Sequence, residues 1–208
     1  MYKPDVIILG MPRSGTSLVA NILSDMGVDL YSGNKSIDNM YLKKFNKNGY
    51  YQRKDIHLFI KKSNAYHFNE KLVKKKDVID DFNLILKNTK KSNKPYIGFK
   101  EPYLLYILPI IKIKPLIIIV IRNIRDVIKS CNKFLNYKEI LHPKVWINYY
   151  SYFIEQKFDY ICINYDKLIQ DPINIYNKFY LDLKKRLPKI NKIKIDLYIL
   201  YNNRKYYK

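Results

Sequence analysis

The sequence predicts an α/β fold in which helices cover both faces of a parallel sheet. Short apolar runs at residues 5–9, 115–121 and 160–164 lack the polar alternation of a half-exposed strand. Such runs are typical of buried strands in a parallel sheet. Segments with helical periodicity separate these runs along the chain, as expected of βα units. The length of 208 residues suits one domain, and we predict a single domain over residues 1–208.

The individual elements follow from local patterns. Leu18, Ile22 and Met26 recur at a spacing of four, which predicts a helix that Gly27 ends. Residues 28–55 are polar and rich in turn formers, so we expect an irregular excursion there. The predicted order is a strand at 5–9, a Gly-rich turn at 10–15, helices at 16–26, 54–64 and 70–88, a strand at 95–99, a helix at 103–111, a strand at 115–121, helices at 124–134 and 143–157, a strand at 160–164, and a helix from Pro172 into a lysine-rich, helical C-terminal third.

The chain is strongly basic, with 39 Lys and Arg against 18 Asp and Glu and a formal net charge of +21. Hydrophobic residues at 48% and aromatic residues at 15% exclude a disordered basic tail, because such a tail lacks core-forming residues. The charge is compatible with an anionic ligand, a nucleic acid or a membrane surface. The lysines are spread through every segment, which favours solvated surfaces over a concentrated nucleic-acid interface.

The two cysteines, Cys131 and Cys162, predict neither a disulfide framework nor a metal site. We expect both in or near the core of a protein in a reducing compartment. The apolar run near the N-terminus is too short for a signal peptide. The longest apolar run, residues 116–121, is far shorter than the roughly 20 residues of a membrane-spanning helix. The sequence therefore predicts a cytoplasmic protein without a transmembrane segment.

The loop at residues 10–17, GMPRSGTS, lies between the first strand and the first helix. Its spacing is that of a nucleotide phosphate loop: a glycine, four residues, a second glycine and two hydroxyl residues. The N–H groups of such a loop and the N-terminus of the following helix bind an anion. Thr16 stands where ATPases have a lysine, and no acidic residue ends the strand 115–121 to hold Mg²⁺. We therefore expect an anion site without a metal, in which Arg13 supplies the cation.

A second group of polar residues follows the strand 115–121. Arg122 stands at its carboxyl end, where ligands bind in open α/β sheets, and Ser130 lies about two helical turns further on. A bidentate arginine and a hydroxyl donor suit a doubly charged phosphate. Together with the loop, this pair resembles the two signatures of the sulfotransferases that use 3′-phosphoadenosine 5′-phosphosulfate (PAPS). That family often has proline where this chain has Ile124.

Three further blocks resemble bacterial and tyrosylprotein-type members of this family. Residues 100–102, Lys-Glu-Pro, are similar to a Lys-Asp-Pro segment. Residues 48–56 are similar to a segment with a glycine, two aromatic residues and a glutamate, and residues 165–172 to a late block with Tyr-Glu-Asp-Leu and Asp-Pro. All five blocks follow the family's order and together cover residues 5–175.

The resemblance implies a three-layer, P-loop NTPase-like sulfotransferase fold and transfer of a sulfuryl group from PAPS to a hydroxyl or amine. The acceptor would be a small molecule or a glycan, bound on the side formed by residues 28–91. Lys100 would stabilise the leaving phosphate beside Arg13. The residues implied to bind PAPS and its product, adenosine 3′,5′-bisphosphate, are Arg13, Ser14, Gly15, Thr16, Ser17, Arg122 and Ser130.

The proton acceptor stays open, because Gln52 stands where the family often has glutamate and an amide takes up no proton at neutral pH. The candidates are Asp55, His57 and Glu101. Each also has a structural interpretation: an acid at a helix N-terminus for Asp55, a helix-surface residue for His57 and an ion pair with a lysine for Glu101. A family member that binds PAPS without turnover is also compatible with Gln52.

Two functions of other classes stay open from the sequence alone. A P-loop kinase of a small metabolite would need the lysine and the Mg²⁺ carboxylate that the loop lacks. A basic nucleic-acid-binding protein could use the many lysines and aromatic residues as a stacking surface.

Overall fold

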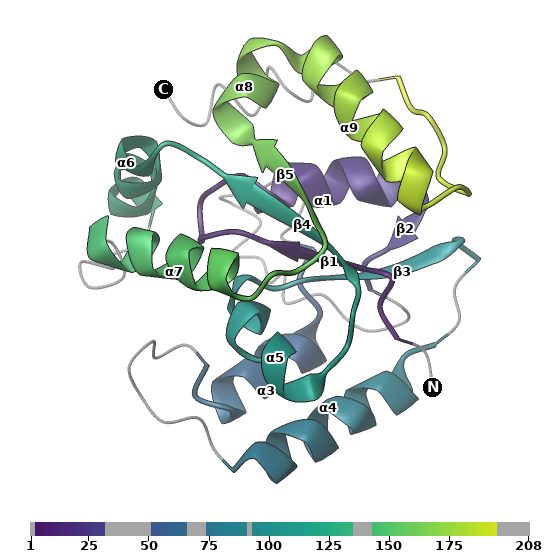
Figure 1. Cartoon of the computed structure of the whole chain (residues 1–208), viewed down its shortest axis with the longest axis vertical. Coiled ribbons are helices and arrows are strands. Elements are labelled where there is room, and N and C mark those ends of the chain that lie inside the picture. The colour runs from purple at the N-terminus through teal and green to yellow at the C-terminus, as the bar shows by residue number, and fades with distance from the viewer. Residues whose placement is uncertain (1–2, 32–50, 66–73, 91–92, 135–142, 195–208) are drawn as a thin grey trace.

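The computed structural model describes residues 3–31, 51–65, 74–90, 93–134 and 143–194. Within these residues a parallel sheet is covered by helices on both faces, which confirms the predicted α/β class (Figure 1). The strands are β1 (Val6–Leu9), β2 (Val28–Asp29), β3 (Tyr96–Lys100), β4 (Leu116–Ile121) and β5 (Tyr160–Asn164). They lie in the order β2-β3-β1-β4-β5, and every neighbouring pair is parallel.

The helices divide between the two faces of the sheet. One core cluster joins the sheet to α1, α8 and α9, and the other joins it to α3, α4, η1, α5 and α7 (Figure 1). The bounds are α1 (Thr16–Asp25), α3 (Lys54–Lys62), α4 (Lys75–Asn88), the 3₁₀ helix η1 (Pro102–Tyr106), α5 (Leu108–Ile111), α6 (Ile124–Phe134), α7 (Pro143–Glu155), α8 (Tyr165–Gln170) and α9 (Pro172–Arg186).

The interior strand β4 is buried on both faces, as its uninterrupted apolar sequence predicts. Ile118 faces the α1 side and Ile117 the α7 side of the sheet. The prediction for β5 was wrong in part, because β5 is an edge strand with alternating burial. Cys162 is therefore exposed, whereas Cys131 on α6 is buried as expected.

The structure differs from the predicted elements at four places. Residues 28–29 form the two-residue strand β2 inside the segment that we expected to be irregular; residues 32–50 of that segment lie outside the described part of the chain. The helix expected at 103–111 is divided into η1 and α5, and α5 ends where Lys112 adopts a left-handed conformation. The short helix α8 precedes α9 and was not predicted. In the C-terminal third, which we expected to be helical, residues 187–194 are not helical, and residues 195–208 lie outside the described part of the chain. Of the helix expected at 70–88, residues 70–73 also lie outside it.

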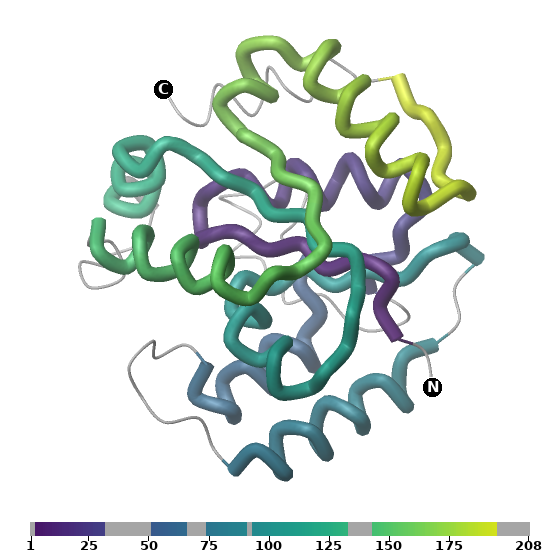
Figure 2. Tube along the Cα trace, viewed as in Figure 1, coloured from purple at the N-terminus to yellow at the C-terminus, as the bar shows by residue number. Residues whose placement is uncertain are grey.

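Two connections of the sheet diverge at the carboxyl ends of β1 and β3. The chain leaves β1 for α1 on one face of the sheet, whereas it leaves β3 for η1 and α5 on the other face. Figure 2 traces this second connection, which passes on the α4 side and returns as β4. Ligands of open α/β sheets bind where adjacent connections diverge in this way. The loop after β1 and the residues that follow β3 and β4 meet there.

Candidate functional site

The loop between β1 and α1 has the backbone of an anion-binding nest. Arg13 has a φ of 71° and Gly15 a φ of 93°, so both lie in the left-handed region. The Ser14 N–H donates to the Met11 carbonyl, which closes the turn. The N–H groups of Leu18 and Val19 donate to the Gly15 carbonyl and so begin the ladder of α1. The earlier N–H groups of the helix point toward its N-terminal end, where they can bind an anion.

Gly15 is required by a ring that packs on the loop. A Cβ atom at this position would lie 2.0 Å from Cδ2 of Tyr165. The guanidinium of Arg122 lies over the same ring, 4.8 Å from its centroid. Tyr165 therefore packs against both the loop and the arginine that ends β4.

The two predicted anion-binding groups are in direct contact. Arg13 Nε donates to Ser130 Oγ at 3.0 Å, and Arg122 Nη1 donates to the Arg13 carbonyl at 3.1 Å. Ser130 and Arg122 are buried, with 4% and 6% of their surfaces exposed. The loop, the end of β4 and the helix α6 thus form one cationic cluster.

Residues 165–172, which follow β5, contact the same cluster through Asp166. Asp166 Oδ2 accepts a hydrogen bond of 2.7 Å from the Asn123 N–H, and its Oδ1 lies 3.9 Å from Arg122 Nε. The Asn123 side chain in turn accepts from the Arg125 N–H at the start of α6. Asp166 therefore holds the start of α6 and the guanidinium of Arg122 in a fixed relation.

Lys100 is the last residue of β3 and lies beside the start of α1. Its ammonium group donates to Ser17 Oγ at 3.5 Å, and only 5% of the residue is exposed. The register of the sheet pairs Lys100 with Ile8 of β1, two residues before the loop. A buried lysine at the carboxyl end of a strand, next to the loop, is placed to meet the negative charge of a ligand bound there.

Glu101, itself a candidate proton acceptor, contacts both Gln52 and a second candidate, His57. Its side chain is almost fully buried, at 1% exposed. Its Oε2 atom accepts a hydrogen bond of 2.8 Å from the Gln52 amide and lies 3.7 Å from His57 Nδ1. The block of resemblance at residues 48–56 thus contacts the Lys-Glu-Pro segment through Gln52. Residues 48–50 of that block lie outside the described part of the chain.

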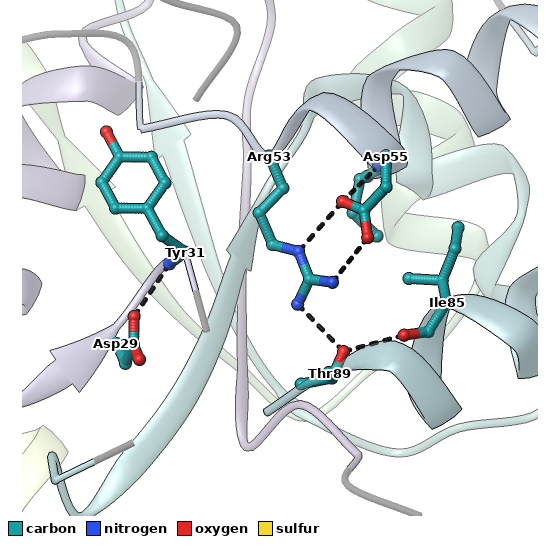
Figure 3. A network of polar contacts seen from close by, with 7 residues as sticks. Asp29, Tyr31, Arg53, Asp55, Ile85 and Thr89 are labelled. Atoms are coloured by element: carbon teal, nitrogen blue, oxygen red, sulfur yellow. Dashed lines mark hydrogen bonds and ion pairs between the residues drawn. The ribbon is translucent and has the colours of Figure 1, made fainter. Parts of the chain in front are cut away.

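Asp55 has a structural partner of its own (Figure 3). Arg53, buried at 1% exposed, donates to both carboxylate oxygens of Asp55, at 3.1 and 2.6 Å, and to Thr89 Oγ1 at 3.0 Å. The Arg53 guanidinium also lies over the Phe99 ring, 4.7 Å from its centroid. Asp55 Oδ1 additionally accepts from the Ile56 N–H in the first turn of α3. The carboxylate is therefore engaged in holding α3 to α4 and β3.

Two buried tyrosines on α7 also reach the site, although no sequence motif identified them. The Tyr149 hydroxyl accepts from the Gly10 N–H at 3.0 Å and donates to the Pro102 carbonyl at 2.8 Å. The Tyr150 hydroxyl accepts from the Met11 N–H at 3.3 Å and donates to the Val120 carbonyl at 2.8 Å. Burial raises the pKa of Tyr149 well above its usual value and that of Tyr150 to about 12.

The described residues contain neither a cluster of metal ligands nor a membrane-spanning helix. Among them, no three His, Cys, Asp or Glu side chains are grouped closely enough to hold a metal ion. Likewise, within the part of the chain that the structure covers, no helix has the length and apolar character needed to cross a bilayer.

Comparisons with known proteins concern the fold and the family of the chain. Among solved structures, the chain is similar to the crystal structure of sulfotransferase STF9 from Mycobacterium avium, with 12% sequence identity, a TM-score of 0.52 and coverage of 98% of this chain and 67% of that one. It is also similar to a sulfotransferase domain from the curacin biosynthetic pathway, with 13% sequence identity and a TM-score of 0.48. This match covers 96% of this chain and 77% of that one. No curated protein sequence matches the chain. The sequence model of the sulfotransferase domain matches residues 3–189, which is most of the chain. The chain therefore belongs to the sulfotransferase domain family.

Proposed function

We propose that the protein transfers a sulfuryl group from PAPS to a hydroxyl or amine of an acceptor. The observation that carries this proposal is the contact between the loop and the end of β4, through Arg13, Ser130 and Arg122. One nucleotide that carries an anion at each end of its ribose would bridge these two groups. Lys100 lies on the opposite side of the loop, at Ser17, where the reacting end of such a ligand would lie.

The chemistry of these residues fits PAPS. Ser130 Oγ accepts from Arg13, and a hydroxyl that accepts one hydrogen bond can still donate its own proton to a phosphate oxygen. The guanidinium groups of Arg13 and Arg122 suit phosphate oxygens because their donors are planar and permanently charged. On the other side, the N–H groups at the start of α1 suit the 5′-phosphosulfate.

The residues of the chain would act mainly by position and charge. PAPS supplies the sulfuryl group and a phosphate leaving group, and the leaving group becomes more negative as its bond to sulfur breaks. Lys100 is held where its ammonium can neutralise that charge, and the loop N–H groups support it, whereas the Arg13 guanidinium is directed to Ser130. Because these donors are fixed before the reaction, they need little reorganisation during it.

The proton of an acceptor hydroxyl would pass to the Glu101 and His57 pair. Asp55 is engaged by Arg53, whereas Glu101 and His57 lie next to Gln52, where relatives often carry a glutamate. Glu101 is too buried to reach an acceptor easily, but its carboxylate lies at Nδ1 of the more exposed His57 ring. This arrangement would orient the imidazole and stabilise it when it takes up a proton. We propose His57 as the proton acceptor and Glu101 as its partner.

The acceptor itself is proposed only by class. Sulfotransferases act on hydroxyl and amine groups, and a carbohydrate or another small molecule is the class that we propose. The cluster of Gln52, His57 and Glu101 would face the acceptor, since it lies on the α3 side, at the end of β3.

The direct test is turnover of PAPS by the purified protein. We expect adenosine 3′,5′-bisphosphate to form faster when a panel of sugars and phenols is added as acceptors. Lys100→Met should lower the rate while the bisphosphate still binds. Mg²⁺-dependent consumption of ATP with no consumption of PAPS would instead support a kinase, and binding of PAPS without turnover on any acceptor would support a binding protein.

A further inference from the structure

Two adjacent tyrosines on α7 bring their hydroxyl groups to the carboxyl ends of three strands. Tyr149 and Tyr150 lie on a helix that packs on one face of the sheet, and both are buried. Their hydroxyl groups bond to backbone atoms about 30 to 139 residues away in the chain. Each tyrosine joins the phosphate loop to a different neighbouring segment.

Tyr149 joins the loop to the segment that carries Lys100. Its hydroxyl accepts from the N–H of Gly10, the first residue after β1, and donates to the carbonyl of Pro102, two residues after Lys100. A single oxygen atom thus bridges the two strand ends between which the reacting group would lie. Loss of this atom would leave a backbone donor and a backbone acceptor buried without their partner.

Tyr150 joins the loop to the segment that carries Arg122. Its hydroxyl accepts from the Met11 N–H and donates to the carbonyl of Val120, two residues before Arg122. Because the Tyr150 proton goes to Val120, Ser14 Oγ, which lies 3.3 Å away, is the donor in the third contact. The Val120 carbonyl also lies only 2.5 Å from where a Cβ of Gly10 would be, so β1 and β4 approach closely at this point.

We propose that Tyr149 and Tyr150 are positioning residues for sulfuryl transfer, with Tyr149 setting the place of Lys100 and Tyr150 that of Arg122 relative to the loop. This inference rests on the proposed function. Neither hydroxyl is expected to contact the ligand. The effect arises because reacting groups displaced by a fraction of an ångström lose much of their catalytic effect. The hydroxyl groups keep their protons at working pH, since burial raises the pKa of both.

The test uses Tyr149→Phe and Tyr150→Phe, each of which removes one oxygen atom and leaves the ring in place. Tyr149→Phe should lower kcat by about tenfold or more and change the Kd for adenosine 3′,5′-bisphosphate by less than about threefold. Tyr150→Phe should raise the Kd for the bisphosphate by about tenfold and that for adenosine 5′-phosphate much less, because only the former reaches Arg122. A purely structural role would lower the melting temperature of both variants without separating these constants.

Tyr152→Phe is the matched control, because it lies on the same helix and its ring packs on Tyr106, with centroids 5.1 Å apart. It should keep the wild-type constants. A double variant sharpens the test: once Lys100→Met has been made, adding Tyr149→Phe should lower kcat by less than about twofold further. All variants are assayed at a temperature at which their circular dichroism matches that of the wild-type protein.

The outcomes separate the two proposals. A wild-type protein that neither binds the bisphosphate nor uses PAPS would overturn the proposed function and this inference together. An active wild-type protein whose Tyr149→Phe and Tyr150→Phe variants behave like Tyr152→Phe would overturn the positioning role alone. The positioning role would also be wrong if the two variants lost turnover and affinity in equal measure.

Discussion

Arg13 and Ser130 are 117 residues apart in the chain, yet Arg13 Nε donates a hydrogen bond of 3.0 Å to Ser130 Oγ. This bond ties the loop after β1 to the helix after β4. It brings together the two groups of residues that we expect at the two charged ends of one nucleotide. Several expected outcomes depend on this contact and on the buried residues around it.

Ser130→Ala should weaken binding of adenosine 3′,5′-bisphosphate. The change removes a hydroxyl donor to the phosphate and also the acceptor that orients Arg13. We expect a loss of about tenfold in affinity, or about 1.4 kcal/mol, measured by calorimetry. Ser151→Ala, an exposed position on α7, is the control and should bind normally. Unchanged affinity of the Ser130 variant would remove this residue from the site.

Gly15→Ala should disrupt the loop for two reasons. Gly15 has a φ of 93°, and a Cβ there would lie 2.0 Å from the Tyr165 ring. Gly27→Ala separates the two causes, because Gly27 also has a positive φ, of 108°, but its Cβ would lie no closer than 3.3 Å to Pro95. Both variants should lose about 1 to 2 kcal/mol of unfolding free energy from backbone strain. Only Gly15→Ala should also lose bisphosphate binding, in a direct titration of both proteins.

Asp55→Asn should lower stability and spare turnover, whereas His57→Gln should spare stability and lower turnover. Asp55 neutralises the buried Arg53, so its loss should lower the unfolding free energy by about 2 to 3 kcal/mol, seen in urea titrations. The remaining folded protein should turn over normally. His57→Gln should stay folded and lose about 100-fold or more in kcat. If Asp55→Asn lost turnover while keeping its stability, Asp55 and not His57 would be the better proton acceptor.

The stability of the protein should fall at high pH in a way that depends on Tyr150. Burial raises the pKa of this hydroxyl from 10.0 to about 12. Between pH 10 and pH 12 the folded protein keeps this proton, whereas the unfolded chain releases it. The stabilisation is therefore complete below pH 10 and is lost as the pH rises toward 12. For one group the slope approaches about 1.4 kcal/mol per pH unit.

This pH effect is measured by urea titrations of the wild-type protein and Tyr150→Phe across the same window. The other tyrosines are common to both proteins, so the difference in slope belongs to Tyr150. We expect the wild-type protein to lose stability more steeply than the variant. Parallel slopes would mean that the Tyr150 hydroxyl titrates alike in the folded and unfolded states.

The sequence was sufficient to predict the strands β1, β3, β4 and β5, the turn after β1, and a helix after Arg122 that carries Ser130. These features depend on local spacing: an apolar run, a glycine turn, and a helix that carries Ser130 two turns beyond Arg122. The strand β2 was missed because two residues, Val28 and Asp29, carry no periodicity. Cys162 was misplaced because the sequence of β5 does not show that it lies at an edge of the sheet.

The contacts that depend on tertiary structure could not be predicted. Tyr149 and Tyr150 bond to backbone groups, and any residue can supply a backbone N–H or carbonyl, so no partner can be identified from the chain. The polar stretch around Arg53 predicts an exposed cation, yet Arg53 is buried and bonds to Asp55 and Thr89. Charge and spacing therefore select the candidate residues, whereas the fixed geometry of these residues comes from packing.

The most direct test of the central claim is calorimetry of adenosine 3′,5′-bisphosphate and adenosine 5′-phosphate on the wild-type protein and Arg122→Ala. The wild-type protein should bind the bisphosphate at micromolar concentration or better and the monophosphate at least about tenfold more weakly. Arg122→Ala should abolish most of that difference while it changes monophosphate binding little. No binding of the bisphosphate at high micromolar concentration, or equal losses for both ligands in the variant, would contradict the account.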